Sequence, residues 1–187
     1  MKETPKSVWN PARLDVKAFA QAGARLQMQD PLERFERLQQ ELHQPEDPVG
    51  MPVSWTIQAE LRPGAQGGAP AAWLHLEADA RVALTCQRCL GPVEAPLQVD
   101  NWFRFVADEA TAEAQDDDCE EDLLALEPRP SLLDVLEDEL LMALPIVPMH
   151  ETCPHALVMQ AGDPAVPAAD DAQERPHPFA GLARLKK

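Results

Sequence analysis

The chain has 187 residues, with 16 Lys and Arg against 32 Asp and Glu, so its formal net charge is -16. This excess of acid excludes a protein whose whole surface grips a nucleic-acid backbone, because displacing counterions from phosphates requires net positive charge. Hydrophobic residues make up 45% of the chain, which is enough for a core and excludes wholesale disorder. The 19 prolines favour turns and tails around a small core over a long helical bundle.

The negative charge is concentrated in one stretch. Residues 101–151 contain 2 basic and 15 acidic side chains, whereas residues 1–100 contain 10 and 13. The last 13 residues, RPHPFAGLARLKK, carry four cations and no acid. We therefore predict an acidic segment and a separate basic tail, whose cations are Arg175, Arg184, Lys186 and Lys187.

The N-terminal residues lack the unbroken apolar stretch of a secretory signal, and no run is long and apolar enough to span a membrane. Four cysteines in a chain without an export signal are typical of thiols or metal ligands rather than of a disulfide framework. We therefore expect a cytoplasmic protein without a membrane partner.

Two helices are predicted near the N-terminus. The first covers residues 15–24, where Val16, Phe19 and Ala20 share one side. The second begins at Asp30 and Pro31, because aspartate can cap free amides and proline fits the first turn. It ends at Pro45, and an apolar stripe runs along it: Leu32, Phe35, Leu38 and Leu42.

Alternating apolar residues predict three strands, at residues 53–61, 74–84 and 93–106, and Pro63 to Pro70 supplies a glycine-rich turn between the first two. Antiparallel pairing of neighbouring strands is the simplest topology for them. The sequence thus predicts an α+β fold in which a small antiparallel sheet packs with N-terminal helices and one C-terminal amphipathic helix.

The acidic residues 107–130 are poor in large apolar side chains and predict a mobile loop. Ser131 then caps the clearest helix, LLDVLEDELLMAL, which ends before Pro145. We expect residues 1–160 to form one α+β domain. Residues 161–187 are predicted to be a flexible proline-rich linker and the disordered basic tail.

Cys86 and Cys89 form a Cys-x-x-Cys pair between two predicted strands, followed by Gly91. Two thiolates at this spacing can bind one tetrahedral metal ion from a tight turn, as in a zinc knuckle. A redox dithiol needs its first thiol at a helix N-terminus, which the strand-like sequence after Pro92 disfavours. Plain reduced thiols remain an open alternative.

A structural zinc ion would need two further ligands. Candidates are His150, Cys153 and His155, which lie just after the acidic helix, and a Cys₃His set would comprise Cys86, Cys89, Cys153 and His150. Cys119 lies among carboxylates that would raise its pKa, so we interpret it as incidental.

Four carboxylates of the acidic helix are candidates for a structural or partner-binding role: Asp134, Glu137, Asp138 and Glu139. Asp134 and Asp138 share one face, and the wet side of an amphipathic helix explains them better than a catalytic metal does. Glu139 falls on the apolar side, where a carboxylate requires a partner. We predict that it is partly buried in an ion pair, with candidate cations Arg81, Arg88 and Arg104.

No nucleotide-binding loop or nucleophile elbow is evident in the sequence, so we do not expect an enzyme. Three segments together resemble the YceD family: CQRCLGPVEAPL after a strand, SLLDVLEDELLMALPIVPMHETC, and the terminal HPFAGLARLKK. That family is named for large ribosomal RNA subunit accumulation. The resemblance covers residues 85–187 well and the preceding part by layout.

The resemblance implies cytoplasmic work in ribosome biogenesis, in the synthesis, processing or stability of 23S rRNA, with no catalytic residues to carry over. Many relatives have further Cys-x-x-Cys pairs after the Leu-Pro segment. This sequence has His150, Cys153 and His155 there.

Two mechanisms follow from the charge distribution. In one, Arg81, Arg88 and Arg104 contact 23S rRNA or its precursor, and the acidic segment points away. The basic tail supplies the other contacts with RNA or the ribosome, through Arg175, Arg184, Lys186 and Lys187. In the other, the protein is an acidic chaperone for a basic large-subunit ribosomal protein. The charge distribution favours this second mechanism, because the acidic stretch repels phosphate. A thiol redox protein is the third hypothesis. The sequence leaves the oligomeric state open.

Overall fold

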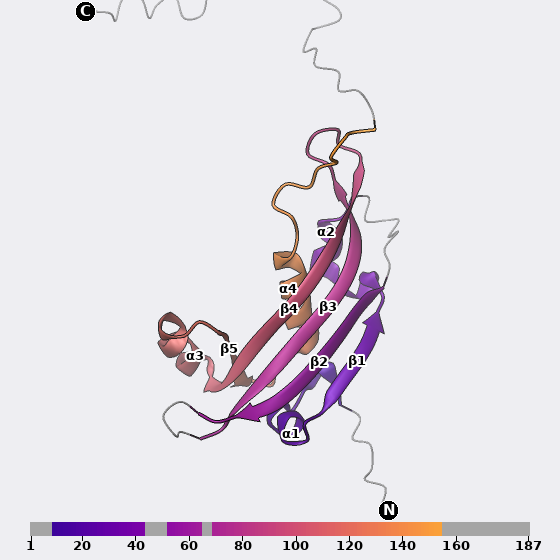
Figure 1. Ribbon diagram of the computed structural model, residues 1–187. Helices are drawn as coiled ribbons and strands as arrows, with labels where there is room; N and C mark the ends of the chain where they lie inside the picture. The colour runs from indigo at the N-terminus through magenta and orange to yellow at the C-terminus, as the bar shows by residue number, and fades with distance from the viewer. Residues whose placement is uncertain (1–8, 44–51, 65–68, 155–187) are drawn as a thin grey trace, which may run out of the picture. The chain divides into compact units, whose positions relative to one another are not determined.

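The structure, a computed structural model, describes residues 9–43, 52–64 and 69–154. Its centre is one five-stranded sheet with the strand order β1-β2-β3-β4-β5 (Figure 1). The strands are β1 (Arg25–Asp30), β2 (Val53–Arg62), β3 (Ala71–Thr85), β4 (Pro92–Asp108) and β5 (Asp122–Glu127). The first four pair antiparallel, whereas β5 lies parallel to β4. The α+β prediction is confirmed, and the sheet is mixed rather than purely antiparallel.

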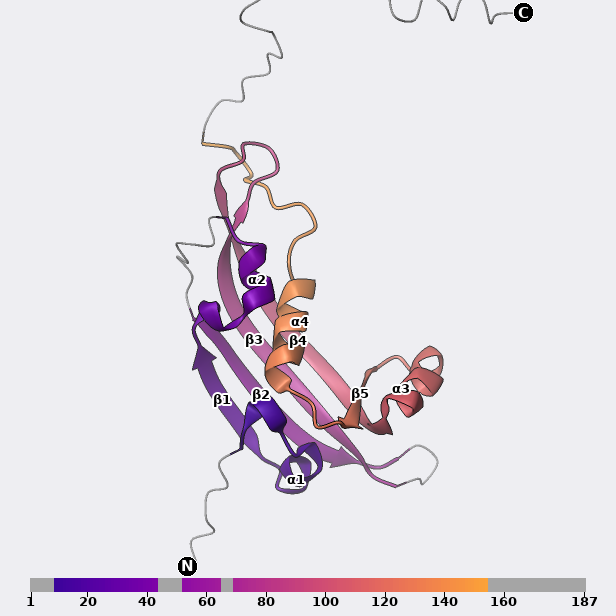
Figure 2. The same ribbon diagram turned by 180° about the vertical axis from the view of Figure 1, so that it is seen from behind.

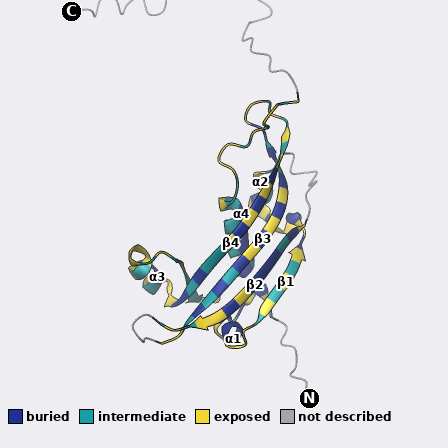
Figure 3. Cartoon of the chain, in the orientation of Figure 1, coloured by how far each residue is buried: buried dark blue, intermediate teal, exposed yellow. Residues whose placement is uncertain are grey.

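The three predicted strands are the long central ones, and their alternating pattern produces two unlike faces. Along β3 the side chains of Leu74, Leu76 and Val82 are buried, while Glu77 and Arg81 between them are exposed. The same alternation appears as stripes across the sheet in Figure 3. A period of two places every second side chain on one face. Because these side chains are apolar, that face of the sheet must be covered.

Three helices cover that face: α1 (Val16–Gln21), α2 (Glu36–Gln40) and α4 (Leu132–Met142) (Figure 2). Short 3-10 turns at Pro11–Arg13 and Leu32–Arg34 lead into the first two. The largest fully buried side chains come from both layers and include Phe19, Phe35, Ile57, Leu76, Leu97, Leu136 and Leu140. Burying one such aliphatic side chain stabilises the fold by roughly 1.5–3 kcal/mol.

Two of the predicted helix starts are confirmed. Asp15 caps α1, its carboxylate accepting from the Ala18 amide at 3.0 Å. Ser131 caps α4, with its hydroxyl oxygen 3.3 Å from the Asp134 amide. The last helical residue is Met142, in agreement with the predicted end before Pro145.

The predicted helix start at Asp30 is wrong. Asp30 is the last residue of β1, and its buried carboxylate accepts from the Trp55 indole at 2.7 Å and from Arg34 at 2.5 Å. The chain then makes a 3-10 turn and begins α2 only at Glu36. The carboxylate accepts from the Trp55 indole, which only the tertiary structure brings near it, and local capping rules do not consider such a partner.

The predicted mobile loop over residues 107–130 is also wrong. It contains α3 (Glu109–Gln115), a 3-10 turn at Asp116–Asp118, and β5. The Asp108 carboxylate caps α3 through the amide and hydroxyl of Thr111, and these bonds lower the pKa of Asp108. The strand forms because β4 offers an unpaired edge, which is a tertiary feature.

No helix among the described residues is long and apolar enough to cross a membrane. The predicted linker and basic tail, residues 161–187, lie outside the described residues. Their separation from one domain at residues 1–160 therefore stays a prediction.

Candidate metal centre

The Cys-x-x-Cys pair lies in the turn that joins β3 to β4. The two strands pair as far as Thr85 and Pro92, and the Cys86 amide donates to the Gly91 carbonyl at 2.9 Å. The Leu90 amide donates back to the Cys86 carbonyl at 2.9 Å. The prediction that the cysteine pair lies in a tight turn between two strands is thus confirmed. Within this turn, the residue with left-handed backbone is Leu90, whose φ is 58°, and not Gly91.

A second arm comes from the segment that follows α4. From Met142 this segment runs along the sheet to the tip of the β3–β4 hairpin (Figures 1 and 2). There the Gln87 amide donates to the Pro148 carbonyl at 2.9 Å, and the Arg88 guanidinium donates to the His150 carbonyl at 2.8 Å. Two segments about 60 residues apart in sequence are thus held side by side by one backbone hydrogen bond and one bond from a side chain to the backbone.

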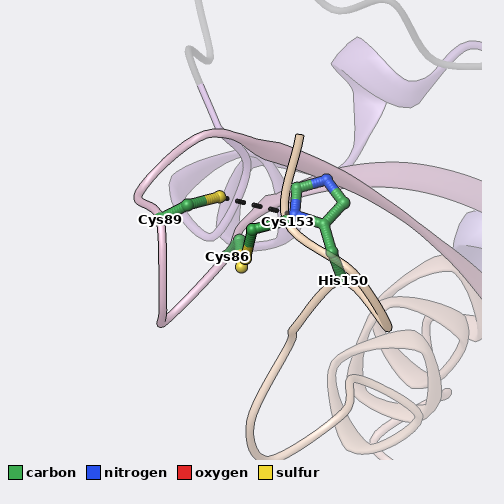
Figure 4. A group of neighbouring side chains, drawn as sticks. All are labelled: Cys86, Cys89, His150 and Cys153. Carbon is green, nitrogen blue, oxygen red and sulfur yellow. Dashed lines mark hydrogen bonds between the residues drawn. The ribbon is translucent and has the colours of Figure 1, made fainter. Parts of the chain in front are cut away.

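These two arms bring together Cys86, Cys89, His150 and Cys153, whose ligand atoms all lie within 4.8 Å of one another (Figure 4). The Cys89 sulfur is 3.5 Å from His150 Nδ1. Zinc bonds of about 2.3 Å to sulfur and 2.0 Å to nitrogen place two tetrahedral ligands about 3.5–3.8 Å apart. The cluster therefore matches the ligand spacing of a tetrahedral metal site to within small side-chain adjustments.

The thiols differ in acidity. Burial by itself would raise the pKa of Cys86, but hydrogen bonds from the backbone amides of Cys89, His150 and Arg88 outweigh it and lower this pKa to about 5. Burial and the neighbouring sulfurs raise the pKa of Cys153 to about 11. A turn that presents several amides to one sulfur favours the thiolate, which is the form that binds metal.

Four protein ligands fill the coordination shell of a tetrahedral ion, which is typical of a structural site; a catalytic zinc keeps one position for water. This donor set of three thiols and one imidazole can therefore hold a metal that ties the hairpin to the segment after α4. A redox dithiol would have its first thiol at a helix N-terminus, whereas Cys86 follows a strand and enters a turn.

The other candidate ligands do not join this cluster within the described residues. Cys119 lies after the Asp116–Asp118 turn, and its thiol contacts the carbonyls of Asp116 and Glu121. All four cysteines are free thiols. His155 lies outside the described residues.

Comparison with known proteins matches residues 74–186 of the chain to the model of one family, "Large ribosomal RNA subunit accumulation protein YceD". The matched region contains both arms of the cysteine–histidine cluster. The chain belongs to the YceD family. A relative from Haemophilus influenzae, described as a large ribosomal RNA subunit accumulation protein YceD, is 34% identical over 110 residues. No solved structure gives a significant match.

The alignment with this YceD relative covers 57% of the chain and 60% of the relative. The family match begins within β3, so α1, α2, β1 and β2 precede it. Those elements nevertheless complete the sheet and cover its buried face. The matched and unmatched parts of this YceD chain therefore share one core.

Among the four carboxylates of α4, Glu137 has a role that the sequence analysis did not foresee. It is buried and accepts from the backbone amides of Arg37 at 2.7 Å and Leu38 at 3.2 Å, and from the Arg37 Nε at 3.0 Å. These amides are at the free N-terminus of α2, so Glu137 caps that helix from 100 residues away in sequence. Asp138 is exposed and pairs with the same guanidinium at 2.5 Å.

Glu139 is half-buried, as expected, but the predicted ion pair is not found among the described residues. Its carboxylate accepts from the Asn101 amide at 3.3 Å. Burial and the nearby charges of Asp122 and Asp138 raise its pKa. The three candidate cations have other partners: Arg81 pairs with Glu94, Arg88 contacts the His150 carbonyl, and Arg104 pairs with Glu121.

Asp134 is exposed in the first turn of α4, where a negative charge is favourable. The four cations of the basic tail, Arg175, Arg184, Lys186 and Lys187, lie outside the described residues. Their contact with RNA or the ribosome stays a prediction.

Proposed function

We propose that this YceD protein is a non-enzymatic ribosome biogenesis factor that supports the synthesis, processing or stability of 23S rRNA of the large subunit. The observation that carries the proposal is the family match over residues 74–186, which spans the metal cluster and α4. Assembly of the bacterial large subunit would place the protein in the cytoplasm. Its partner would be 23S rRNA or its precursor, a basic large-subunit ribosomal protein, or both.

Deletion of the gene tests this proposal directly. We expect the ratio of 23S to 16S rRNA to fall in the deletion strain and to recover when the wild-type chain is supplied. An unchanged ratio of mature and precursor 23S rRNA during growth at several temperatures would contradict it. A pull-down with and without ribonuclease would then separate an RNA partner from a protein partner.

The acidic-chaperone form of the function is favoured by the pairing of the strand arginines. Arg81 and Arg104, which would have to contact phosphate, already hold Glu94 at 2.7 Å and Glu121 at 2.5 Å. Phosphate would have to displace these carboxylates, and Arg104 and Glu121 also lie within the acidic residues 101–151, which repel phosphate. Direct rRNA binding would then depend on Arg88, whose guanidinium donates to a carbonyl, and on the four tail cations Arg175, Arg184, Lys186 and Lys187. A steep salt dependence of rRNA binding, lost when these four cations become glutamine, would instead favour the RNA-binding form.

We also propose that Cys86, Cys89, His150 and Cys153 hold a structural zinc ion. In this role the metal would fasten the β3–β4 hairpin to the segment after α4, whose large apolar side chains, such as Ile146 and Val147, are exposed instead of packed in a core. A thiol redox protein is the weaker alternative, since the turn and the segment after α4 together present three thiols and an imidazole instead of an isolated pair.

Metal content distinguishes these alternatives. Protein purified without chelators should contain about one zinc per chain, and Cys86→Ser should lose it. Cys119→Ser is the matched control, because its thiol lies outside the cluster. Wild-type protein free of zinc, with Cys86 and Cys89 forming a reversible disulfide, would favour the redox alternative.

A further inference from the structure

Exposed large apolar side chains gather at one place on the described surface. Five of the six that the described residues expose belong to the knuckle or to the segment that reaches it: Leu90, Met142, Ile146, Val147 and Met149. We call these five residues the clasp strip. Ile146 is 99% exposed and Met142 is 80% exposed. Scattered apolar residues need no explanation, but a cluster of this kind is typical of an interaction site.

The fold itself does not account for the clasp strip. The segment carrying Ile146 and Val147 is held at one end by α4 and at the other by the Gln87–Pro148 backbone bond, so its apolar side chains are not needed to fix it. Leu90 is 70% exposed and has left-handed backbone. That conformation is unfavourable for a leucine and costs glycine almost nothing. A strained and exposed leucine therefore suggests a use outside the fold.

The charge around the clasp strip indicates the kind of partner. Residues 131–153 contain five carboxylates and no lysine or arginine. Glu151 is exposed just after Met149, and Asp100 and Glu139 line one hollow with Met142. The cation beside Leu90, Arg88, donates to the His150 carbonyl. A phosphate backbone would be repelled here, whereas lysine and arginine side chains would be attracted. An apolar strip with an acidic rim fits a segment in which cations alternate with large aliphatic side chains.

We propose that the clasp strip is a docking surface for a basic, aliphatic-containing segment of a partner protein. The aliphatic side chains of the partner would cover Leu90, Ile146 and Val147, and its cations would pair with the surrounding carboxylates. This inference rests on the proposed function for its choice of partner, because large-subunit assembly supplies basic proteins that must be shielded from premature contacts.

Fluorescence anisotropy with the full-length chain tests the proposal. The probe is a labelled synthetic peptide in which lysine alternates with leucine, and the comparison peptide has serine in place of leucine. Ile146→Ser with Val147→Ser should weaken binding of the leucine peptide by roughly tenfold or more, since the side chains lost would otherwise be buried. Leu61→Ser, which removes a large exposed apolar side chain outside the strip, should leave binding unchanged.

Leu90→Gly separates docking from folding. The variant relieves the left-handed strain, so its thermal midpoint should equal or exceed that of the wild type, while binding of the leucine peptide weakens. Loss of binding in a variant that is at least as stable cannot come from misfolding.

Four results would overturn the inference. In the first, all variants bind the leucine peptide equally well; in the second, the wild type binds the leucine and serine peptides with equal affinity. In the third, the wild type binds single-stranded RNA more strongly than the leucine peptide, and the strip variants abolish that binding. In the fourth, the chain associates with itself through the strip. The proposed function is judged separately, by the 23S rRNA ratio in the deletion strain. A normal ratio with strip-dependent peptide binding would reject the function alone, and a reduced ratio with strip-independent binding would reject the docking surface alone.

Discussion

Replacing Glu137 by alanine should be among the most destabilising single changes in α4. The substitution removes the acceptor for two backbone amides at the N-terminus of α2 and for the Arg37 guanidinium. The Leu38 amide bond is buried, so this donor would lose its partner away from water. Leaving a buried hydrogen-bond donor unpaired costs about 1–3 kcal/mol. Removing one partner of a buried ion pair, so that the other charge stays buried alone, costs about 3–5 kcal/mol.

Because Arg37 is half-exposed and can turn to water, we expect Glu137→Ala to lower the free energy of unfolding by about 3 kcal/mol. Glu137→Gln keeps an acceptor oxygen but loses the charge, so roughly half of that loss is expected. Asp138→Ala is the matched control. It removes a more exposed carboxylate from the same guanidinium and should cost less than about 1 kcal/mol.

Urea titration followed by tryptophan fluorescence and circular dichroism measures these differences, with metal content held constant across the variants. The slope of the unfolding free energy against urea should be similar in all of them, because the fold is retained. If Glu137→Ala lay within 0.5 kcal/mol of Asp138→Ala, the capping of α2 by Glu137 would have no energetic role and the reasoning would be refuted.

Three further predictions concern other groups. Asp30→Ala should lower the free energy of unfolding by about 2–3 kcal/mol in urea titration, because the buried Trp55 indole would lose its acceptor, and an effect below 1 kcal/mol would contradict this. Glu139→Gln should stabilise the protein at neutral pH by less than about 1 kcal/mol. Because the folded pKa of Glu139 is raised, its charged form is unfavourable above that pKa, so this gain should vanish as the pH falls below the ordinary value of 4.5. Added zinc should raise the thermal midpoint of metal-stripped wild-type and Cys119→Ser protein but not of Cys86→Ser, and a shift in Cys86→Ser would argue for binding elsewhere.

Several features were predictable because they depend on residues close together in the sequence. Alternating apolar side chains specified β2, β3 and β4. The shared side of Val16, Phe19 and Ala20 indicated α1, and the capping residue Ser131 marked the start of α4. The Cys-x-x-Cys spacing between two strands specified the knuckle, since both thiols lie in a single turn. His150 and Cys153 were named as ligands by residue type alone, and their approach to the knuckle depends on how α4 packs.

The sequence by itself determined the central antiparallel strands, the amphipathic helix, the knuckle and the distribution of charge, because each follows from local periodicity or spacing. Only the tertiary structure decided the partners of the carboxylates. Asp30 accepts from an indole on β2, Glu137 caps a helix 100 residues away, and Glu139 meets an amide where a guanidinium was expected. It also decided that the acidic segment contains β5, because a strand of that composition forms only where an edge such as that of β4 is available. A carboxylate takes whichever donor the packing of distant elements brings to it, and local sequence rules contain no information about that donor.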